Sequence, residues 1–371
     1  MYLGENIKKL GFGLMRLPML GDEVDLEQTK QMVDLFLQKG FTYFDTAFGY
    51  LDGKSEAAIK LALVDRYPRD KFLLATKLPA WSGVKTTAAA QQQFFTSLER
   101  TGAGYFDFYL LHNLGDSRTQ TFDDFQIWDF LAEQKKKGLI RHLGFSIHDT
   151  ADKLEEVLTK HPEMEFVQLQ INYADWEDKL IQSRACYETA RRHGKPVIIM
   201  EPVKGGTLAK LPPDITKIFK DAKPDASLPS WAIRYAASLE GLVTVLSGMS
   251  NLEQMQDNLS FMSDFKPLDQ EERCVIENVR EALEKIPTIP CTACSYCTKN
   301  CPQHIVIPQI FAAMNTYLTF DQLKGAKNDY NWETRLGGKG SQCIECGQCE
   351  DACPQHIKII EELKRAVAIF E

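Results

Sequence analysis

The chain alternates short apolar runs with longer stretches whose apolar residues recur at helical spacing, from about residue 10 to residue 249. The short runs are rich in β-branched and aromatic residues and are predicted strands. There are eight of them, at residues 10–14, 41–45, 72–77, 106–112, 142–146, 166–170, 197–200 and 242–247. Several are almost continuously apolar, as expected for parallel strands with helices on one side and packed side chains on the other.

The longer stretches are predicted helices. They span residues 26–37, 87–101, 122–137, 151–159, 179–193 and 228–239, and several stop at a glycine, namely Gly40, Gly102, Gly138 and Gly194, as helices commonly do. Strands that alternate with helices form parallel sheets, so eight such units predict an α/β fold of the TIM (β/α)8 barrel type. An open doubly wound sheet is disfavoured because no G-x-G-x-x-G follows an early strand.

A second domain is predicted after the barrel. Residues 251–261 and a charged segment at 269–285 are helical in pattern, and Ile286-Pro287-Thr288-Ile289-Pro290 follows them. Two prolines so close together cannot continue a helix. We therefore place the barrel in residues 1–285 and a smaller domain in residues 286–371. A chain of 371 residues with 44% apolar residues has enough apolar material for both.

Composition excludes some classes of partner. The formal net charge of −8 disfavours nucleic acid, which requires a concentrated basic face. The N-terminus has no basic start followed by an apolar core, and no run approaches the roughly 18 apolar residues of a membrane span. We therefore expect a cytoplasmic protein with no membrane partner. Eight of the ten cysteines fall within residues 291–353, which indicates metal ligands in a reducing compartment rather than disulfides.

Reactive side chains close three successive predicted strands. Asp45 ends the second strand, Lys77 the third and His112 the fourth. Tyr50 follows Asp45 in a polar loop, before a helix that begins near Ser55. The reacting groups of TIM barrels sit at the carboxyl ends of strands. These four residues are therefore the predicted active site.

The stretch D-T-A-F-G-Y-L-D-G-K-S-E at residues 45–56 resembles the D-T-A-x-x-Y-x-x-G-x-S-E signature of the aldo/keto reductases. That family has a (β/α)8 barrel and transfers hydride between NAD(P)H and carbonyls. The resemblance implies a catalytic tetrad of Asp45, Tyr50, Lys77 and His112. Tyr50 is then the general acid, because carbonyl reduction also needs a proton at oxygen, and Lys77 is expected to lower the pKa of its phenol. Asp45 would hold Lys77, and His112 would orient the carbonyl oxygen.

The same resemblance implies a set of cofactor-binding positions, which are Ser146, Gln170, Met200, Gly248, Gln254 and Asn258. Ser146 and Gln170 match residues that bind the nicotinamide carboxamide, and Met200 stands where an aromatic ring often stacks on the nicotinamide. Gly248 and Gln254 take the places of a lysine and an arginine that grip the 2′-phosphate of NADPH. Because both charges are missing, the cofactor is expected to be NADP or NAD, without a choice between them.

Two copies of the pattern C-x2-C-x2-C-x3-C-P lie in the second domain. The first copy has Cys291, Cys294, Cys297 and Cys301, and the second has Cys343, Cys346, Cys349 and Cys353. This run ligates [4Fe-4S] clusters in bacterial-type ferredoxins, and the domain resembles helical ferredoxin-like domains with two such clusters. In two-cluster folds the fourth cysteine of each motif ligates the other cluster. Cys353 is therefore expected to join the first three cysteines of the first copy, and Cys301 those of the second copy. Zinc is the alternative, because paired C-x2-C motifs also bind it.

Four further residues have weaker signals. Gln-His-Ile follows the Cys-Pro of each copy, which indicates a duplicated unit. His304 and His356 are expected to pack beside the clusters or to support their ligands rather than to ligate them. Cys186 and Cys274 stand outside both sets and are expected to be buried thiols.

The favoured hypothesis is an NAD(P)H-dependent oxidoreductase that interconverts a carbonyl and an alcohol and carries two [4Fe-4S] clusters for electron transfer. Its partners are then a small carbonyl or alcohol substrate and a protein electron donor or acceptor. Hydride moves as an electron pair, whereas each cluster passes single electrons, and the sequence has no flavin-binding signal. One alternative is an electron-transfer or redox-sensing protein whose barrel is not a carbonyl reductase. Another is an independent carbonyl reductase whose clusters are structural.

Overall fold

The computed structural model describes residues 3–299, 301–335 and 337–371. The chain forms two compact units. The first contains the residues up to Val203 together with Pro229–Asp269, and the second contains Lys204–Leu228 together with Gln270–Glu371. The second unit thus includes two segments that the sequence groups with the barrel. The predicted domain boundary after Lys285 stays a prediction.

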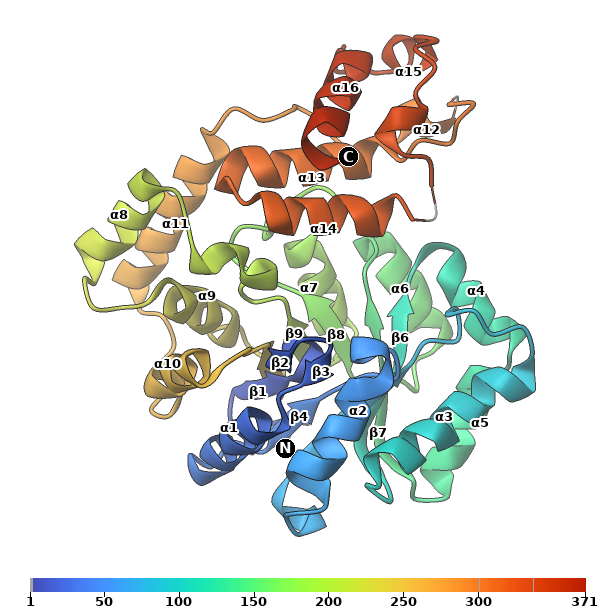
Figure 1. Cartoon of the computed structure of the whole chain (residues 1–371), viewed down its shortest axis with the longest axis vertical. Helices are drawn as coiled ribbons and strands as arrows, with labels where there is room; N and C mark the ends of the chain where they lie inside the picture. Colours follow the sequence, from blue (N-terminus) through green and yellow to red (C-terminus); the bar gives the residue numbers. More distant parts are fainter. Residues whose placement is uncertain (1–2, 300, 336) are drawn as a thin grey trace. The chain divides into compact units, whose positions relative to one another are not determined.

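The first unit is built on a closed barrel of eight parallel strands, which confirms the predicted fold class (Figure 1). Around the barrel the strands follow the order β1, β10, β9, β8, β7, β6, β5, β4, and β1 pairs with both β10 and β4. Their bounds are Leu10–Gly13 for β1, Tyr43–Asp45 for β4, Leu73–Leu78 for β5, Phe106–Leu114 for β6, Ile140–Ile147 for β7, Val167–Gln170 for β8, Val197–Met200 for β9 and Leu242–Ser247 for β10. All eight predicted runs are therefore strands.

Helices connect these strands, mostly where the sequence predicts them. They include α1 (Leu26–Gln38), α2 (Lys54–Ile59), α3 (Thr87–Thr101), α6 (Ala151–Lys160), α7 (Ser183–Arg192), α9 (Leu228–Ala237) and α10 (Leu252–Met262). Helix α3 shows the predicted glycine stop, because Gly102 has a left-handed φ of 63° and donates its N–H to Leu98 O at 2.9 Å. Within the described ranges no helix combines the length and the apolar character needed to cross a membrane.

The single helix predicted over residues 122–137 is wrong. The structure has α4 (Asp116–Asp124) and α5 (Ile127–Lys136), separated at Gln126, whose φ is 53°. Phe122 and Leu131 are both fully buried. Nine residues apart on one continuous helix, they would point to opposite faces. The break lets both side chains enter the core.

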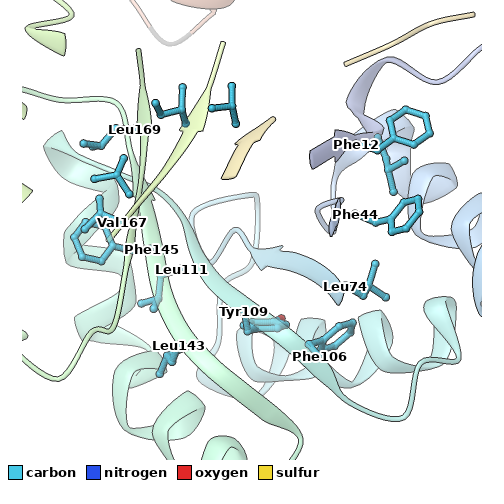
Figure 2. Close-up of a cluster of buried hydrophobic side chains, with 14 of the residues drawn as sticks. Phe12, Phe44, Leu74, Phe106, Tyr109, Leu111, Leu143, Phe145, Val167 and Leu169 are labelled. Carbon is cyan, nitrogen blue, oxygen red and sulfur yellow. The ribbon is translucent and has the colours of Figure 1, made fainter. Parts of the chain in front are cut away.

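The core has an inner and an outer layer. Tyr43, Ala75 and Phe108 belong to the cluster inside the barrel. Phe44 and Leu74, one residue along from the first two, belong to the larger cluster between strands and helices, as Figure 2 shows. Alternate residues of a strand point to opposite faces. The layers therefore fix which residues of each strand point inward.

The second unit holds the cysteines between helices. These are α8 (Pro213–Ala222), α11 (Gln270–Glu284), α12 (Tyr296–Lys299), α13 (Ile307–Phe320), α14 (Leu323–Glu333), α15 (Gln348–Asp351) and α16 (Ile359–Phe370). The duplication is visible in the backbone, because His304 and His356 have φ values of 50° and 52°. Their backbone N–H groups donate to Cys301 O and Cys353 O, both at 3.0 Å. Both imidazoles are exposed.

The two remaining cysteines differ in burial. Cys186 is 4% exposed, as predicted, and burial raises its pKa to about 12. Cys274 is exposed, so the prediction that it is buried is wrong. Helix α11 turns Ile276, Val279 and Leu283 inward, and Cys274 lies on another face of that helix.

Replacing Phe36 of α1 by alanine tests how the outer layer stabilises the barrel. The ring is fully buried and lies 5.2 to 5.8 Å from those of Phe41, Phe44 and Phe12. We expect the free energy of unfolding to fall by about 3–5 kcal/mol, because the cavity left behind cannot fully collapse. Urea unfolding followed by tryptophan fluorescence measures this change. Phe95→Ala, which removes a ring that is 41% exposed, is the control, and an equal loss in both variants would contradict the packing described.

Candidate active site

Three neighbouring strands carry three of the predicted catalytic side chains. The pairing of these strands shows how far along each strand the side chain lies. Asp45 pairs with Ala75 of β5, and Lys77 lies two residues further along that strand. Lys77 pairs with Leu110 of β6, and His112 again lies two residues further. Each step of two keeps the side chain on the inward face. The register therefore brings Asp45, Lys77 and His112 to the carboxyl end of the barrel interior.

Asp45 and Lys77 form a buried ion pair. Lys77 Nζ donates to Asp45 Oδ1 at 2.5 Å and to Thr46 O at 2.8 Å, and the two side chains are only 1% and 3% exposed. Burial lowers the pKa of Lys77, but the neighbouring Asp45 and Tyr50 outweigh burial and raise it. Burial raises the pKa of Asp45, and the ammonium group opposes this. Each charge is tolerated here because the other compensates for its lost hydration.

Tyr50 lies beside this pair. Lys77 Nζ is 4.9 Å from the centroid of the Tyr50 ring, and the imidazole of His112 lies 5.8 Å from that ring at 77°. Burial raises the pKa of Tyr50, and the positive charge of Lys77 only partly offsets it. Lys77 thus acts in the predicted direction, but the predicted net lowering of the pKa is wrong because burial has the larger effect. The phenol is protonated at neutral pH, as a proton donor must be.

The other residues of the 45–56 stretch hold the Tyr50 loop in place. Thr46 Oγ1 and Ser55 Oγ share a hydrogen bond of 2.7 Å, and Thr76 Oγ1 donates to the buried Glu56 Oε1, also at 2.7 Å. Gly53 has a φ of 86°, and a Cβ there would lie 2.8 Å from an arginine side chain. The motif therefore combines two reactive residues with the contacts that position them.

His112 presents a neutral imidazole to the site. Burial, followed by the charge of Lys77, holds its pKa well below 6.5. Trp81 Nε1 donates to the backbone oxygen of His112 at 2.7 Å, whereas Nδ1 of the ring has no partner among the described residues. A neutral imidazole carries one nitrogen that donates and one that accepts a hydrogen bond, which is the chemistry needed to orient an oxygen atom.

Three of the predicted cofactor residues lie near the carboxyl ends of the next strands. Ser146 is near the end of β7, Gln170 closes β8 and Met200 closes β9. Ser146 Oγ accepts a hydrogen bond from the Asn113 N–H at 2.8 Å, and Gln170 Nε2 donates to Asp175 Oδ2 at 3.1 Å. These contacts fix both side chains at the same end of the barrel as the tetrad.

The other three predicted cofactor residues follow β10. Gly248 is exposed, and Gln254 is an exposed residue in the first turn of α10. Asn258 is buried and its Nδ2 donates to Ser247 Oγ at 2.8 Å. The segment is thus held by its own polar side chains, without a basic residue between Gly248 and Gln254.

His148 and Glu201 also act on the site, although the sequence pattern predicts a role for neither. The charge of His148 lowers the pKa of His112. The pKa of His148 is itself lowered, chiefly by the loss of water around the ring, although Glu201 and a hydrogen bond with Gln170 oppose this. His148 lies two residues after Ser146, and this spacing would have predicted that it lies on the same face of the strand. Glu201 carries no such signal, because it follows β9 in the loop.

The cysteines line two cavities in the second unit. Cys291, Cys294 and Cys297 line one cavity together with Cys353. The second cavity is lined by Cys343, Cys346 and Cys349 together with Cys301. Four thiols in a largely apolar lining form the donor set that a [4Fe-4S] cluster requires. The residues present in each cavity therefore fit such a cluster.

Two family models match the chain, one over the barrel and one over the cysteine-rich segment. The model of the aldo/keto reductase family matches residues 9–281, and the model of a 4Fe-4S dicluster domain matches residues 290–357. Together with the barrel, the first match shows that the chain belongs to the aldo/keto reductase family. It is an oxidoreductase with a C-terminal iron–sulfur domain, so the predicted family, fold and enzyme class are confirmed.

Two distant relatives match most of the chain. It is 25% identical over 265 residues to an uncharacterized oxidoreductase of Schizosaccharomyces pombe, which covers 68% of this chain and 81% of the relative. It is 27% identical over 313 residues to D-galacturonate reductase of Fragaria ananassa, with coverage of 76% and 90%.

Two solved structures share the fold of the barrel. The holo form of an aldo-keto reductase from Bacillus halodurans matches with a TM-score of 0.60 and 25% identity, covering 75% of this chain and 95% of that one. An aldo/keto reductase from Klebsiella pneumoniae in complex with NADP and acetate matches with a TM-score of 0.59 and 22% identity, covering 75% and 94%.

Replacing Lys77 by methionine tests the ion pair. We expect the free energy of unfolding to fall by about 3–5 kcal/mol at neutral pH, because the buried carboxylate of Asp45 loses its partner. The folded pKa of Asp45 then lies further above its unfolded value of about 3.9. The deficit is complete above that folded pKa and shrinks as the pH falls through it. Urea unfolding at a series of pH values measures it.

The matched control is Lys137→Met, which removes an exposed lysine paired with Glu133 on the surface, and little change is expected. The double variant Asp45→Asn/Lys77→Met should recover much of the lost stability. A deficit in Lys77→Met that does not change with pH would show that the pair is not ionic.

Proposed function

We propose that the protein reduces a small carbonyl substrate to an alcohol, and catalyses the reverse reaction, with NADH or NADPH as the hydride donor. The observation that carries this proposal is the buried Asp45–Lys77 pair. Lys77 Nζ lies 4.9 Å from the centroid of the Tyr50 ring, and the ring of His112 lies 5.8 Å from that of Tyr50. When bound, the reduced nicotinamide would supply the hydride to the carbonyl carbon. The chain's own residues supply the proton and the orientation.

Tyr50 would donate its phenolic proton to the carbonyl oxygen, leaving a phenolate. Lys77 is placed to stabilise that phenolate as it forms, because its ammonium lies against the ring. Asp45 keeps Lys77 charged and in position. The neutral His112 would hold the substrate oxygen by a hydrogen bond, which orients the carbonyl toward Tyr50. A proton from solvent restores the phenol after the alcohol leaves.

The dinucleotide would lie along the carboxyl ends of β7 to β10. Ser146 and Gln170 would hold the nicotinamide carboxamide, and Met200 would contact its ring. Gly248, Gln254 and Asn258 would lie beside the adenosine end. The Klebsiella pneumoniae relative binds NADP. This supports a dinucleotide here without deciding between NADP and NAD.

We assign two [4Fe-4S] clusters to the two cysteine cavities, with Cys353 and Cys301 exchanged between the sequence motifs. The dicluster match over residues 290–357 and the two sets of four thiols support this. Ile307 lines both cavities, so the clusters would be close neighbours. Such neighbours favour transfer of electrons between them, and a protein donor or acceptor would complete the path. This supports electron transfer as the second function. The predicted cytoplasmic location stays a prediction.

Tyr50→Phe tests the catalytic proposal. It removes the proton donor and keeps the ring, so we expect carbonyl reduction to fall by about 10²- to 10⁴-fold, with dinucleotide binding retained. In the unmodified protein, the rate should hold through neutral pH and fall as the pH rises through the raised pKa of Tyr50. Steady-state reduction of a carbonyl panel, followed at 340 nm, measures both.

The control for this test is Tyr187→Phe, which removes a hydroxyl group bonded to Glu240 O away from the tetrad. It should leave turnover unchanged. Undiminished turnover in Tyr50→Phe would reject the tetrad and leave the electron-transfer or sensing alternative.

Cysteine replacements test the exchanged ligands. If Cys353 and Cys294 hold one cluster, Cys353→Ala should lose about half of the iron and sulfide, and adding Cys294→Ala should cause no further loss. Adding Cys346→Ala instead should remove the second cluster as well. Iron and sulfide analysis of anaerobically purified protein, with electron paramagnetic resonance after reduction, distinguishes these outcomes.

The control is Cys274→Ala, because Cys274 is exposed and lies in neither cavity. Its iron content should match that of the unmodified protein. If Cys353→Ala combined with Cys346→Ala keeps as much iron as Cys353→Ala alone, the exchange is refuted.

A further inference from the structure

Arg16 and Glu201 form an ion pair that crosses the end of the eighth barrel strand. Arg16 closes the short turn after β1, and Glu201 follows β9. The barrel order places β10 between these strands. Arg16 Nη2 lies 3.4 Å from Glu201 Oε1, and the side chains are 42% and 26% exposed. The pair therefore spans the point at which the chain leaves β10.

Gly248 lies directly beneath the arginine. A Cβ placed on Gly248 would be 3.7 Å from Arg16 Cβ and 3.8 Å from Arg16 Cδ. The stem of Arg16 thus runs over the backbone of the loop after the eighth strand. In TIM barrels the loops after the seventh and eighth strands frequently bind phosphate. Glu201 and Gly248 belong to those two loops.

Three backbone N–H groups at the start of α10 already have acceptors within the chain. The Ser250 N–H donates to Gln254 Oε1 at 2.7 Å, the Leu252 N–H to Gln28 Oε1 at 3.2 Å, and the Gln254 N–H to Asn251 Oδ1 at 2.8 Å. These three donors are already occupied by the chain's own side chains. Residues 248–254 also contain no lysine or arginine. Any cation for a phosphate group at this loop must come from another element.

We propose that Arg16 is the residue that binds the pyrophosphate of the dinucleotide, and that Glu201 holds Arg16 in place until the dinucleotide arrives. This inference rests on the proposed function. The pyrophosphate joins the nicotinamide and adenosine halves, so it must lie between the tetrad and α10. The Arg16–Glu201 pair lies between these two regions. Glu201 is close enough to the tetrad to act electrostatically on Tyr50, and Arg16 lies over Gly248, which precedes α10.

The replacement of Glu201 by a phosphate group as the partner of Arg16 is energetically favourable. A partly exposed pair at 3.4 Å is weak, so Arg16 gives up Glu201 at little cost. A phosphate can accept two parallel hydrogen bonds from one guanidinium group, and such charge-assisted bonds are stronger. Glu201 therefore competes with the ligand, and removing its charge should favour binding.

Calorimetric titration of the full chain with its clusters intact tests this role, using NADH, NADPH and ADP-ribose as ligands. Arg16→Gln should raise the Kd of all three by about 10- to 100-fold, and Arg16→Lys should restore part of the affinity. Glu201→Gln should lower the Kd by about 2- to 5-fold. A residue that only supports the fold would not respond in opposite directions to the loss of the two charges.

The matched control is Arg66→Gln, because Arg66 forms a surface pair with Asp34 at 2.8 Å and is 31% exposed. It should leave every Kd unchanged. If Arg16→Gln binds within twofold of the unmodified protein, the role of Arg16 is refuted and the proposed function stands. A loss confined to NADPH would refute the assignment to the pyrophosphate. If the unmodified protein binds neither dinucleotide, the proposed function fails and this inference fails with it.

Discussion

The buried ion pair between Asp45 and Lys77 is the interaction on which the barrel site depends. Neither charge is stable at 1–3% exposure without the other, so the strands that carry them must stay in one register. The same pair sets the chemistry, because the ammonium that neutralises Asp45 also lies against the ring of Tyr50. The same two side chains thus meet a structural requirement and, in the proposed reaction, would meet a catalytic one.

Much of the barrel follows from local pattern. Each predicted strand exists because its apolar residues serve both faces of a sheet that is buried on both sides. Three residues of the proposed tetrad follow from reactive side chains at or near the strand ends, whereas Tyr50 follows from the motif over residues 45–56. The helix predicted over residues 122–137 fails because pattern alone does not register that Phe122 and Leu131 must enter the same core. The direction of the pKa of Tyr50 also fails, since the extent of burial is a property of the folded chain.

Some residues of the site cannot be predicted from sequence spacing, because only closure of the barrel brings them together. Arg16 and Glu201 are 185 positions apart in the chain and meet because β1 and β9 flank β10. No spacing rule connects them. In the second unit the sequence is more informative, because a repeated motif specifies a repeated turn. The same backbone at His304 and His356 is its direct outcome. Which fourth cysteine joins which set depends on how the two copies pack, and the spacing within one motif does not contain that information.

Ile307 lines both cysteine cavities, and this closeness bears on how many electrons the domain could hold at once. One cluster exchanges electrons singly and cannot match a hydride, which carries two. With both cavities filled and separated by the same side chain, the clusters would share their electrons as one store with a capacity of two. The duplication of a short cysteine motif would then set the electron capacity of the domain equal to that of the nicotinamide chemistry on the same chain.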